Sequence, residues 1–180
     1  MNKNNYKFCI FFVIIIMFLF LFSAKGYTGQ DGVLYGQAVR EVKLNRPDFA
    51  FMKFNAIVEL FPNSKYFERA LFAVGEYNFK TANYYDAALA LRQFILKYPK
   101  SRAKLFALVY LLEIYRKQKD QNSVIALEKE IVSFWQFSLL FRNCKIYKYK
   151  SPFSNVYKAL YFIDKVEIYI DDKLLAKVSF

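Results

Sequence analysis

Apolar residues recur every three or four positions through residues 33–137, which is the spacing of amphipathic helices. In the segment 84–97, Ala87, Leu91 and Phe94 fall on one helical face. Pro47 interrupts the pattern once and suits the first turn of the next helix. The predicted helices cover residues 33–44, 49–60, 65–80, 84–97, 101–117 and 123–137.

A short sequence occurs twice in this helical region. Residues 61–65 (FPNSK) return 37 positions later as residues 98–102 (YPKSR). In each copy the proline stops one helix, and Ser64 (with Asn63) or Ser101 is expected to cap the next. Two helix-like segments fill the interval between the copies, so the period indicates stacked helical hairpins rather than a single-core enzyme.

The central repeat resembles the tetratricopeptide repeat, which pairs apolar, Leu and Gly positions in its first helix with small, Tyr and Ala positions in its second. The matching residues are Leu71, Val74, Gly75, Ala82, Tyr84, Ala87, Leu91, Phe94 and Pro99. Asn78 replaces the usual Tyr, and Phe94 replaces a small residue. The resemblance implies that Gly75 and Ala87 let two helices approach closely, while Tyr84 and Leu91 fill the space between hairpins. We therefore expect a mainly α protein with a tetratricopeptide-like array of about three hairpins over residues 33–137.

The aromatic-Pro-x-Ser motif before an Ala-containing helix is similar to the repeats of bacterial envelope proteins of the BamD and YbgF type, the latter a Tol-associated coordinator. This resemblance implies an exported scaffold in outer-membrane or cell-envelope assembly, with other envelope proteins or peptides as partners. The alternative that it leaves open is a membrane-tethered adaptor in cell-wall or division coordination. A lipoprotein of the BamD type has a cysteine just after its leader, whereas residues 23–26 here read SAKG.

The resemblance also implies a binding site, because the first helices of tetratricopeptide arrays line a concave groove that takes peptides or partner helices. Carried over by position, the partner-binding groove consists of Arg69, Phe72, Glu76, Phe79, Lys80, Phe106, Val109, Glu113, Arg116 and Lys117. The basic side chains would pair with acidic groups, and Phe72 and Phe79 would serve as apolar anchors. The alternative for Phe72 and Phe106 is ordinary packing between repeats.

The pattern changes in the C-terminal segment 142–180. Residues 145–150 are basic and strand-like, and Ser151-Pro152 could open a helix that runs to Ile163. Residues 166–170 and 174–180 flank a turn at 171–173 and predict a β-hairpin. We expect this segment to form a small cap that shields the end of the array. A sorting-signal-like tail ending at Phe180 is the alternative.

The first 26 residues have the pattern of a secretory signal. Lys3 and Lys7 precede an apolar run over residues 8–22, and Ala24 and Gly26 supply the small residues of a cleavage site before Tyr27. An uncleaved anchor is the alternative, although the run is short for a membrane span. Cys9 lies at the start of the apolar run and not after it, so no lipobox cysteine is found. The protein is expected in the periplasm or at a membrane.

Composition argues against catalysis. The 180 residues contain no histidine, and Cys144 is the only cysteine after the leader, so imidazole and thiolate metal sites lack ligands. There is no phosphate-binding glycine loop, and no cofactor or metal is expected. The formal charge of +12 favours anionic partners such as a membrane surface or acidic proteins. Because the basic residues are dispersed along the chain, nucleic acid is not an expected partner.

Overall fold

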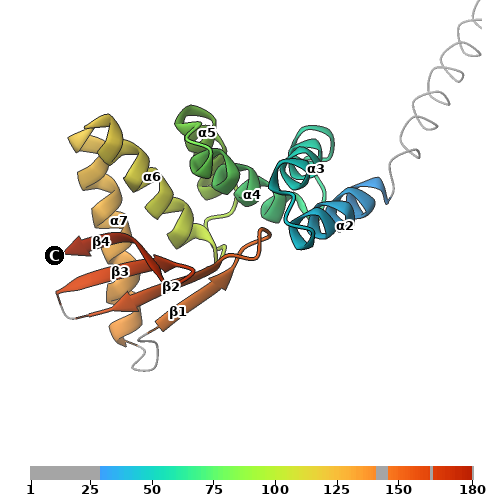
Figure 1. Ribbon diagram of the computed structural model, residues 1–180. Coiled ribbons are helices and arrows are strands. Elements are labelled where there is room, and N and C mark those ends of the chain that lie inside the picture. The colour runs from blue at the N-terminus through green and yellow to red at the C-terminus, as the bar shows by residue number, and fades with distance from the viewer. Residues whose placement is uncertain (1–28, 141–145, 163, 180) are drawn as a thin grey trace, which may run out of the picture.

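The computed structural model describes residues 29–140, 146–162 and 164–179, with helices first and strands last (Figure 1). The helices are α2 (Gln30–Lys43), α3 (Pro47–Leu60), α4 (Phe67–Lys80), α5 (Tyr84–Lys97), α6 (Lys104–Gln118) and α7 (Gln121–Leu140). The strands are β1 (Ile146–Lys150), β2 (Val156–Tyr161), β3 (Lys165–Ile170) and β4 (Lys173–Ser179). The leader over residues 1–26 and the terminal Phe180 lie outside the described residues.

The helices form three hairpins, because each packs mainly on its neighbours in sequence. The pairs α2–α3, α4–α5 and α6–α7 follow one another along the array (Figure 1). This confirms the predicted mainly α fold and its helical repeat array. The first helices of the second and third hairpins are the most buried: α4 carries nine buried residues and α6 carries ten, whereas α2 at the end of the array carries only Ala38. The core therefore lies along the middle and late helices.

The two copies of the repeated sequence make the same contact. Ser64 Oγ accepts a hydrogen bond from Tyr66 N–H at 3.0 Å and donates to Asp31 Oδ2 at 2.7 Å. One repeat later, Ser101 Oγ accepts from Ala103 N–H at 3.1 Å and donates to Glu68 Oε1 at 2.6 Å. The N-cap positions are Tyr66 and Ala103, so the expectation that the serines cap the helices is wrong. Each serine instead ties its turn to the first helix of the preceding repeat.

The C-terminal segment forms an antiparallel sheet in the order β1-β2-β3-β4. The predicted strand at 145–150 and the predicted hairpin at 166–180 are confirmed as β1 and as β3–β4. The predicted helix from Ser151 to Ile163 is wrong, because residues 156–161 pair with both β1 and β3 as strand β2. Their side chains alternate, with Tyr157 and Ala159 buried and Lys158 turned outward, which is the period of a strand.

The sheet packs against the array instead of standing beyond its last helix. In Figure 1 it lies below α4 and α6 and in front of α7, on the side opposite α3 and α5. Its buried face carries Tyr157, Val166, Ile168 and Val178, all with no exposed surface. A two-stranded hairpin is marginal alone, whereas four strands with one apolar face against helices form a stable layer.

Candidate interaction surfaces

The face predicted as the partner groove is covered by the chain's own sheet. Phe72 packs edge-on against Tyr149 and Tyr157, with ring centroids 5.4 and 5.9 Å away. Phe106 contacts Tyr157 at 4.8 Å between centroids. Phe72, Phe106 and Val109 are fully buried. The prediction of an open groove at these positions needs correction, because aromatic side chains of β1 and β2 occupy it.

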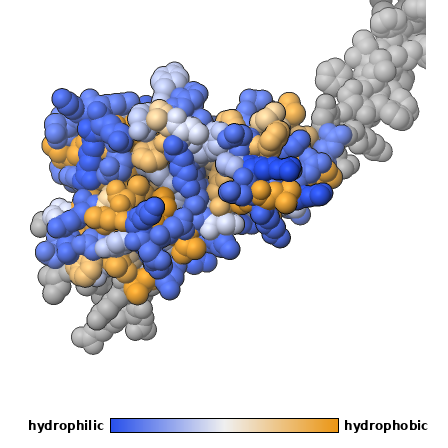
Figure 2. All heavy atoms as spheres, viewed as in Figure 1, coloured by the Kyte–Doolittle hydropathy of each residue, from blue (hydrophilic) through white to orange (hydrophobic). Residues whose placement is uncertain are grey.

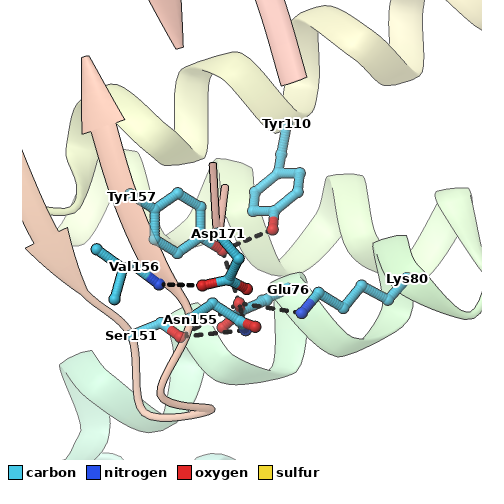
Figure 3. Close-up of polar contacts among 8 residues, drawn as sticks. All are labelled: Glu76, Lys80, Tyr110, Ser151, Asn155, Val156, Tyr157 and Asp171. Atoms are coloured by element: carbon cyan, nitrogen blue, oxygen red, sulfur yellow. Dashed lines mark hydrogen bonds and ion pairs between the residues drawn. The ribbon is translucent and has the colours of Figure 1, made fainter. Parts of the chain in front are cut away.

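Glu76, also predicted to face a partner, is the centre of a buried polar cluster between α4 and the sheet (Figure 3). Its Oε1 accepts hydrogen bonds from Tyr157 Oη–H at 2.6 Å, from Ser151 Oγ–H at 3.2 Å and from the amide of Asn155. Lys80 Nζ lies 3.7 Å from the same oxygen. Tyr110 Oη lies 2.6 Å from Tyr157 Oη, so it donates into the cluster. This carboxyl group therefore ties the first helix of the second hairpin to the sheet.

Burial controls the protonation of this cluster. Removal from water raises the pKa of Glu76, and the charge of Lys80 and the hydrogen bonds from Tyr157, Ser151 and Asn155 oppose that rise. Burial also raises the pKa of Tyr157 well above its ordinary value, and the Glu76 carboxylate adds to the shift. Glu76 Oε2 is buried without a hydrogen-bond partner among the described residues. An unsatisfied oxygen favours the neutral acid over the carboxylate.

Two other predicted groove residues, Arg69 and Phe79, contact aromatic side chains of neighbouring helices. Arg69 is exposed and stands 5.4 Å from the ring of Tyr35. Phe79 is half-buried between Tyr84 and Tyr110, at 5.7 and 4.6 Å between ring centroids. Phe79 is therefore packed among aromatic side chains of the array, whereas Arg69 remains exposed beside Tyr35.

The predicted basic residues on α6 also contact other residues of the chain. Arg116 forms ion pairs with Glu113 at 2.9 Å and Glu128 at 2.8 Å, and it donates to the backbone carbonyl of Lys177 at 3.1 Å. Lys117 lies over the ring of Tyr84 at 5.7 Å. Arg116 therefore connects α6 to α7 and to β4, a contact that helical spacing alone did not indicate.

The residues predicted to pack the repeats lie between α4, α5 and α6. Gly75 faces Leu91, and a Cβ atom built on Gly75 would lie 2.7 Å from Leu91 Cγ and Cδ2. Leu71, Ala87 and Leu91 are buried in the core. Tyr84 is half-buried and touches Phe79, and Pro99 is exposed just after α5 ends. The close approach of α4 and α5 thus requires the absence of a side chain at position 75.

Sequence reasoning missed a groove on the opposite side of the array. It has a volume of about 660 Å³ and runs between α3 and α5 over a floor made by α4. Leu71, Val74 and Ala90 line its base, while Glu59 and Asp86 stand at its rim. Tyr85, Leu89 and Leu96 form a line on α5 beside it and are 78%, 61% and 82% exposed. We call this the α3–α5 groove.

The sequence carried a signal for exposed apolar surface beside this groove. Tyr85, Leu89 and Leu96 follow helical spacing, but they lie off the inward stripe of Ala87, Leu91 and Phe94. Phe49, Met52 and Leu60 form a similar stripe on α3 and are more than half exposed, but they do not line the groove. Figure 2 shows apolar surface over the α2–α3 end of the molecule and a second area over the sheet. A second apolar stripe on an already amphipathic helix indicates a surface that meets another molecule.

Two other kinds of site are absent from the described ranges. Residues 29–140, 146–162 and 164–179 contain no group of three or more Cys, Asp or Glu side chains placed to hold a metal ion. In the same part of the chain, none of the helices has both the length and the apolar character needed to cross a membrane.

Comparison with known proteins identifies the helical part of the chain. Residues 28–144 match the model of the YfiO family, which is described as outer membrane lipoprotein. No curated protein matches the sequence. The match ends before β1, so the four-stranded sheet lies outside the part that the family model covers.

Proposed function

Because the chain belongs to the YfiO family of outer membrane lipoproteins, we propose that it is an exported scaffold in outer-membrane assembly that binds partner proteins and catalyses no reaction. The family match over the helical array carries this proposal. The helical repeats supply extended surfaces for binding, which is the usual use of such arrays. The alternative role, in cell-wall or division coordination, is less well supported because the family description names the outer membrane.

We place partner binding in the α3–α5 groove because the concave face is filled. Tyr149 and Tyr157 cover Phe72, and Phe106 lies beneath the same two rings. A partner segment could reach that face only by displacing a sheet with a large buried apolar side. The α3–α5 groove needs no such displacement.

The shape and chemistry of the α3–α5 groove fit a helical segment of a partner. Its base is apolar, and the line of Tyr85, Leu89 and Leu96 runs lengthwise along α5, as expected for packing against a second helix. Glu59 and Asp86 at the rim would pair with basic residues flanking the apolar face of that helix. The proposed partner segment is therefore an amphipathic helix with apolar residues on one face and Lys or Arg beside them.

The experiment that tests this function is depletion and complementation in the native cell. Depletion should lower the amount of outer-membrane β-barrel proteins, and the wild-type chain should restore it. Leu89→Asp/Leu96→Asp should fold, because both side chains are largely exposed, yet fail to restore the barrels. Val33→Asp on α2, also 60% exposed, is the matched control and should restore them. Unchanged barrel levels after depletion would contradict the assembly role, and rescue by the double variant would contradict the groove assignment.

A further inference from the structure

The two edges of the sheet differ in whether helices of the array cover them. The β4 edge faces α6 and α7, and Arg116 donates to the carbonyl oxygen of Lys177 on that strand. The β1 edge is the first strand in the order β1-β2-β3-β4 and pairs only with β2 among the described residues. One edge is thus closed by the array and the other is open.

The backbone of Lys148 and Lys150 points away from β2. Ser151 N–H donates to the carbonyl of Asn155, which makes these two residues a hydrogen-bonded pair. Val156 N–H donates to Asp171 Oδ1 and the Val156 carbonyl accepts from Asp171 N–H, so Lys150 has no ladder bond to Val156. Bonded and non-bonded pairs alternate along an antiparallel ladder, which leaves Lys148 in the same orientation as Lys150. By this register the N–H and C=O groups of these two residues face away from β2, and no turn or loop bond in the described part of the chain engages them. They form a ready template for one more strand.

Side chains around this edge are basic. Lys148 and Lys150 are exposed on the solvent face, and neither takes part in an ion pair with a described residue. On the opposite face, Tyr147 Oη–H donates to the carbonyl of Arg102 at 2.8 Å, which places an exposed arginine beside the same strand. An incoming strand would place alternate side chains directly beside Lys148 and Lys150, where opposite charges stabilise pairing.

A shallow hollow on the solvent face adjoins the edge. It has a volume of about 290 Å³ and is lined by Ile146, Leu160 and Tyr169 together with Lys148, Lys158 and Asp172. Lys158 is paired with Asp172, so the unpaired charge in the hollow is that of Lys148. The hollow can take an apolar side chain next to an acidic one.

We propose that the open β1 edge binds an extended acidic segment of a partner protein, which adds to the sheet as a fifth strand and places an apolar side chain in the hollow. Backbone hydrogen bonds to Lys148 and Lys150 provide the register, and the lysine charges select acidic residues at alternate positions. This surface is separate from the α3–α5 groove and lies outside the part of the chain that matches the family.

Exposed lysines on an edge strand also have a simpler use, since they prevent edges from pairing with one another. Two observations favour a binding role. The hollow with Ile146 and Leu160 adds exposed apolar surface beside the edge, which protection against pairing does not require. Lys148 itself lines that hollow, so its charge stands directly beside apolar surface.

The test uses the full chain in mild detergent and two fluorescent peptides, one alternating Val with Glu and the other alternating Val with Lys. The acidic peptide should bind, measured by fluorescence anisotropy, and should shift the amide resonances of Lys148 and Lys150. Lys148→Glu/Lys150→Glu should weaken binding about tenfold or more. Lys173→Glu/Lys177→Glu on the β4 side, which changes the net charge equally, should bind as the wild type does.

A second variant separates strand addition from simple charge attraction. Lys148→Pro removes an N–H group that points away from β2, so the β1–β2 ladder remains while the edge loses a donor. It should fold, as checked by circular dichroism, and lose the acidic peptide. Equal binding of both peptides, retention of the acidic peptide by Lys148→Pro, or loss of binding in the β4-side control would overturn the proposal. So would self-association of the chain through β1 in place of peptide binding, or binding to anionic vesicles alone.

Discussion

Tyr157 on β2 donates a hydrogen bond of 2.6 Å to Glu76 on α4, although 81 residues separate them in the sequence. Both side chains are without exposed surface. A buried carboxyl group is costly unless its oxygens are satisfied, and three donors from the sheet side converge on one of them. The contact makes the docking of the sheet sensitive to a single residue of the array.

Glu76→Ala should destabilise the protein by about 3 kcal/mol, because it leaves the buried hydroxyl of Tyr157 and the amide of Asn155 without their acceptor and opens a small cavity. Urea unfolding followed by circular dichroism measures the change. Glu59→Ala, which removes an exposed carboxylate from α3, is the control and should cost less than about 0.5 kcal/mol. A loss at position 76 no larger than that at position 59 would show that the cluster does not hold the sheet.

The stability of the wild type relative to Glu76→Gln should rise as the pH falls from neutral toward 4.5, the ordinary pKa of a glutamate. Burial raises the pKa of Glu76 in the folded state, against the opposing charge of Lys80, so the folded protein binds the proton more tightly than the unfolded chain. The favourable contribution is therefore complete below pH 4.5 and is lost as the pH rises through the folded pKa.

The measurement is the free energy of unfolding of both proteins at a series of pH values. Asp31, Asp120 and Glu167 have lowered pKa values and weaken both proteins alike in acid, so they cancel in the difference. Tyr110 and Tyr157 face the same carboxyl group, but burial raises their pKa values well above 10, outside the range tested. If the difference in unfolding free energy between the wild type and Glu76→Gln were constant with pH, or fell in acid, it would contradict a raised pKa of Glu76 in the folded protein.

Gly75→Ala should destabilise the array by about 1–2 kcal/mol. The new methyl group would overlap Leu91, and overpacking of about 1–3 kcal/mol exceeds the gain of up to about 1 kcal/mol from better helix propensity. Gly36→Ala on α2 is the matched control, because no atom lies within 4 Å of its added Cβ, and it should stabilise the helix. In a Leu91→Ala background, Gly75→Ala should cost less. Additive effects at positions 75 and 91, measured by thermal and chemical unfolding, would argue against this contact.

The turn between β3 and β4 should respond differently at its two aspartates. Both have positive φ, 46° at Asp171 and 65° at Asp172, a conformation that glycine adopts more readily. Asp172→Gly should therefore be close to neutral, because the relief of backbone strain offsets the loss of the exposed ion pair with Lys158. Asp171→Gly should cost about 1 kcal/mol, because Asp171 Oδ1 accepts the Val156 N–H bond at 2.8 Å that fastens the turn to β2. Comparison of the two melting temperatures checks this; an equal effect at both positions would refute the role of the Asp171 carboxylate.

The helical part was predictable because its determinants are local. The inward stripe of Ala87, Leu91 and Phe94 and the proline after it defined the helix at residues 84–97, which the structure shows with the same bounds. The repeat of 37 residues indicated that hairpins stack on one another, and the tie from each repeated serine to the preceding hairpin gives this period a physical basis.

The sequence alone determined the helices, their hairpin order and the β3–β4 hairpin, because periodicity, proline positions and turn residues act over a few residues. Only the tertiary structure decided that residues 156–161 form a strand, that the sheet covers the concave face, and that Glu76 and Phe72 are buried there. A residue on the face of a helix looks the same in sequence whether water, a partner or a distant part of the chain covers it. That choice depends on contacts between residues far apart in sequence, such as Tyr157 with Glu76, which local spacing does not encode.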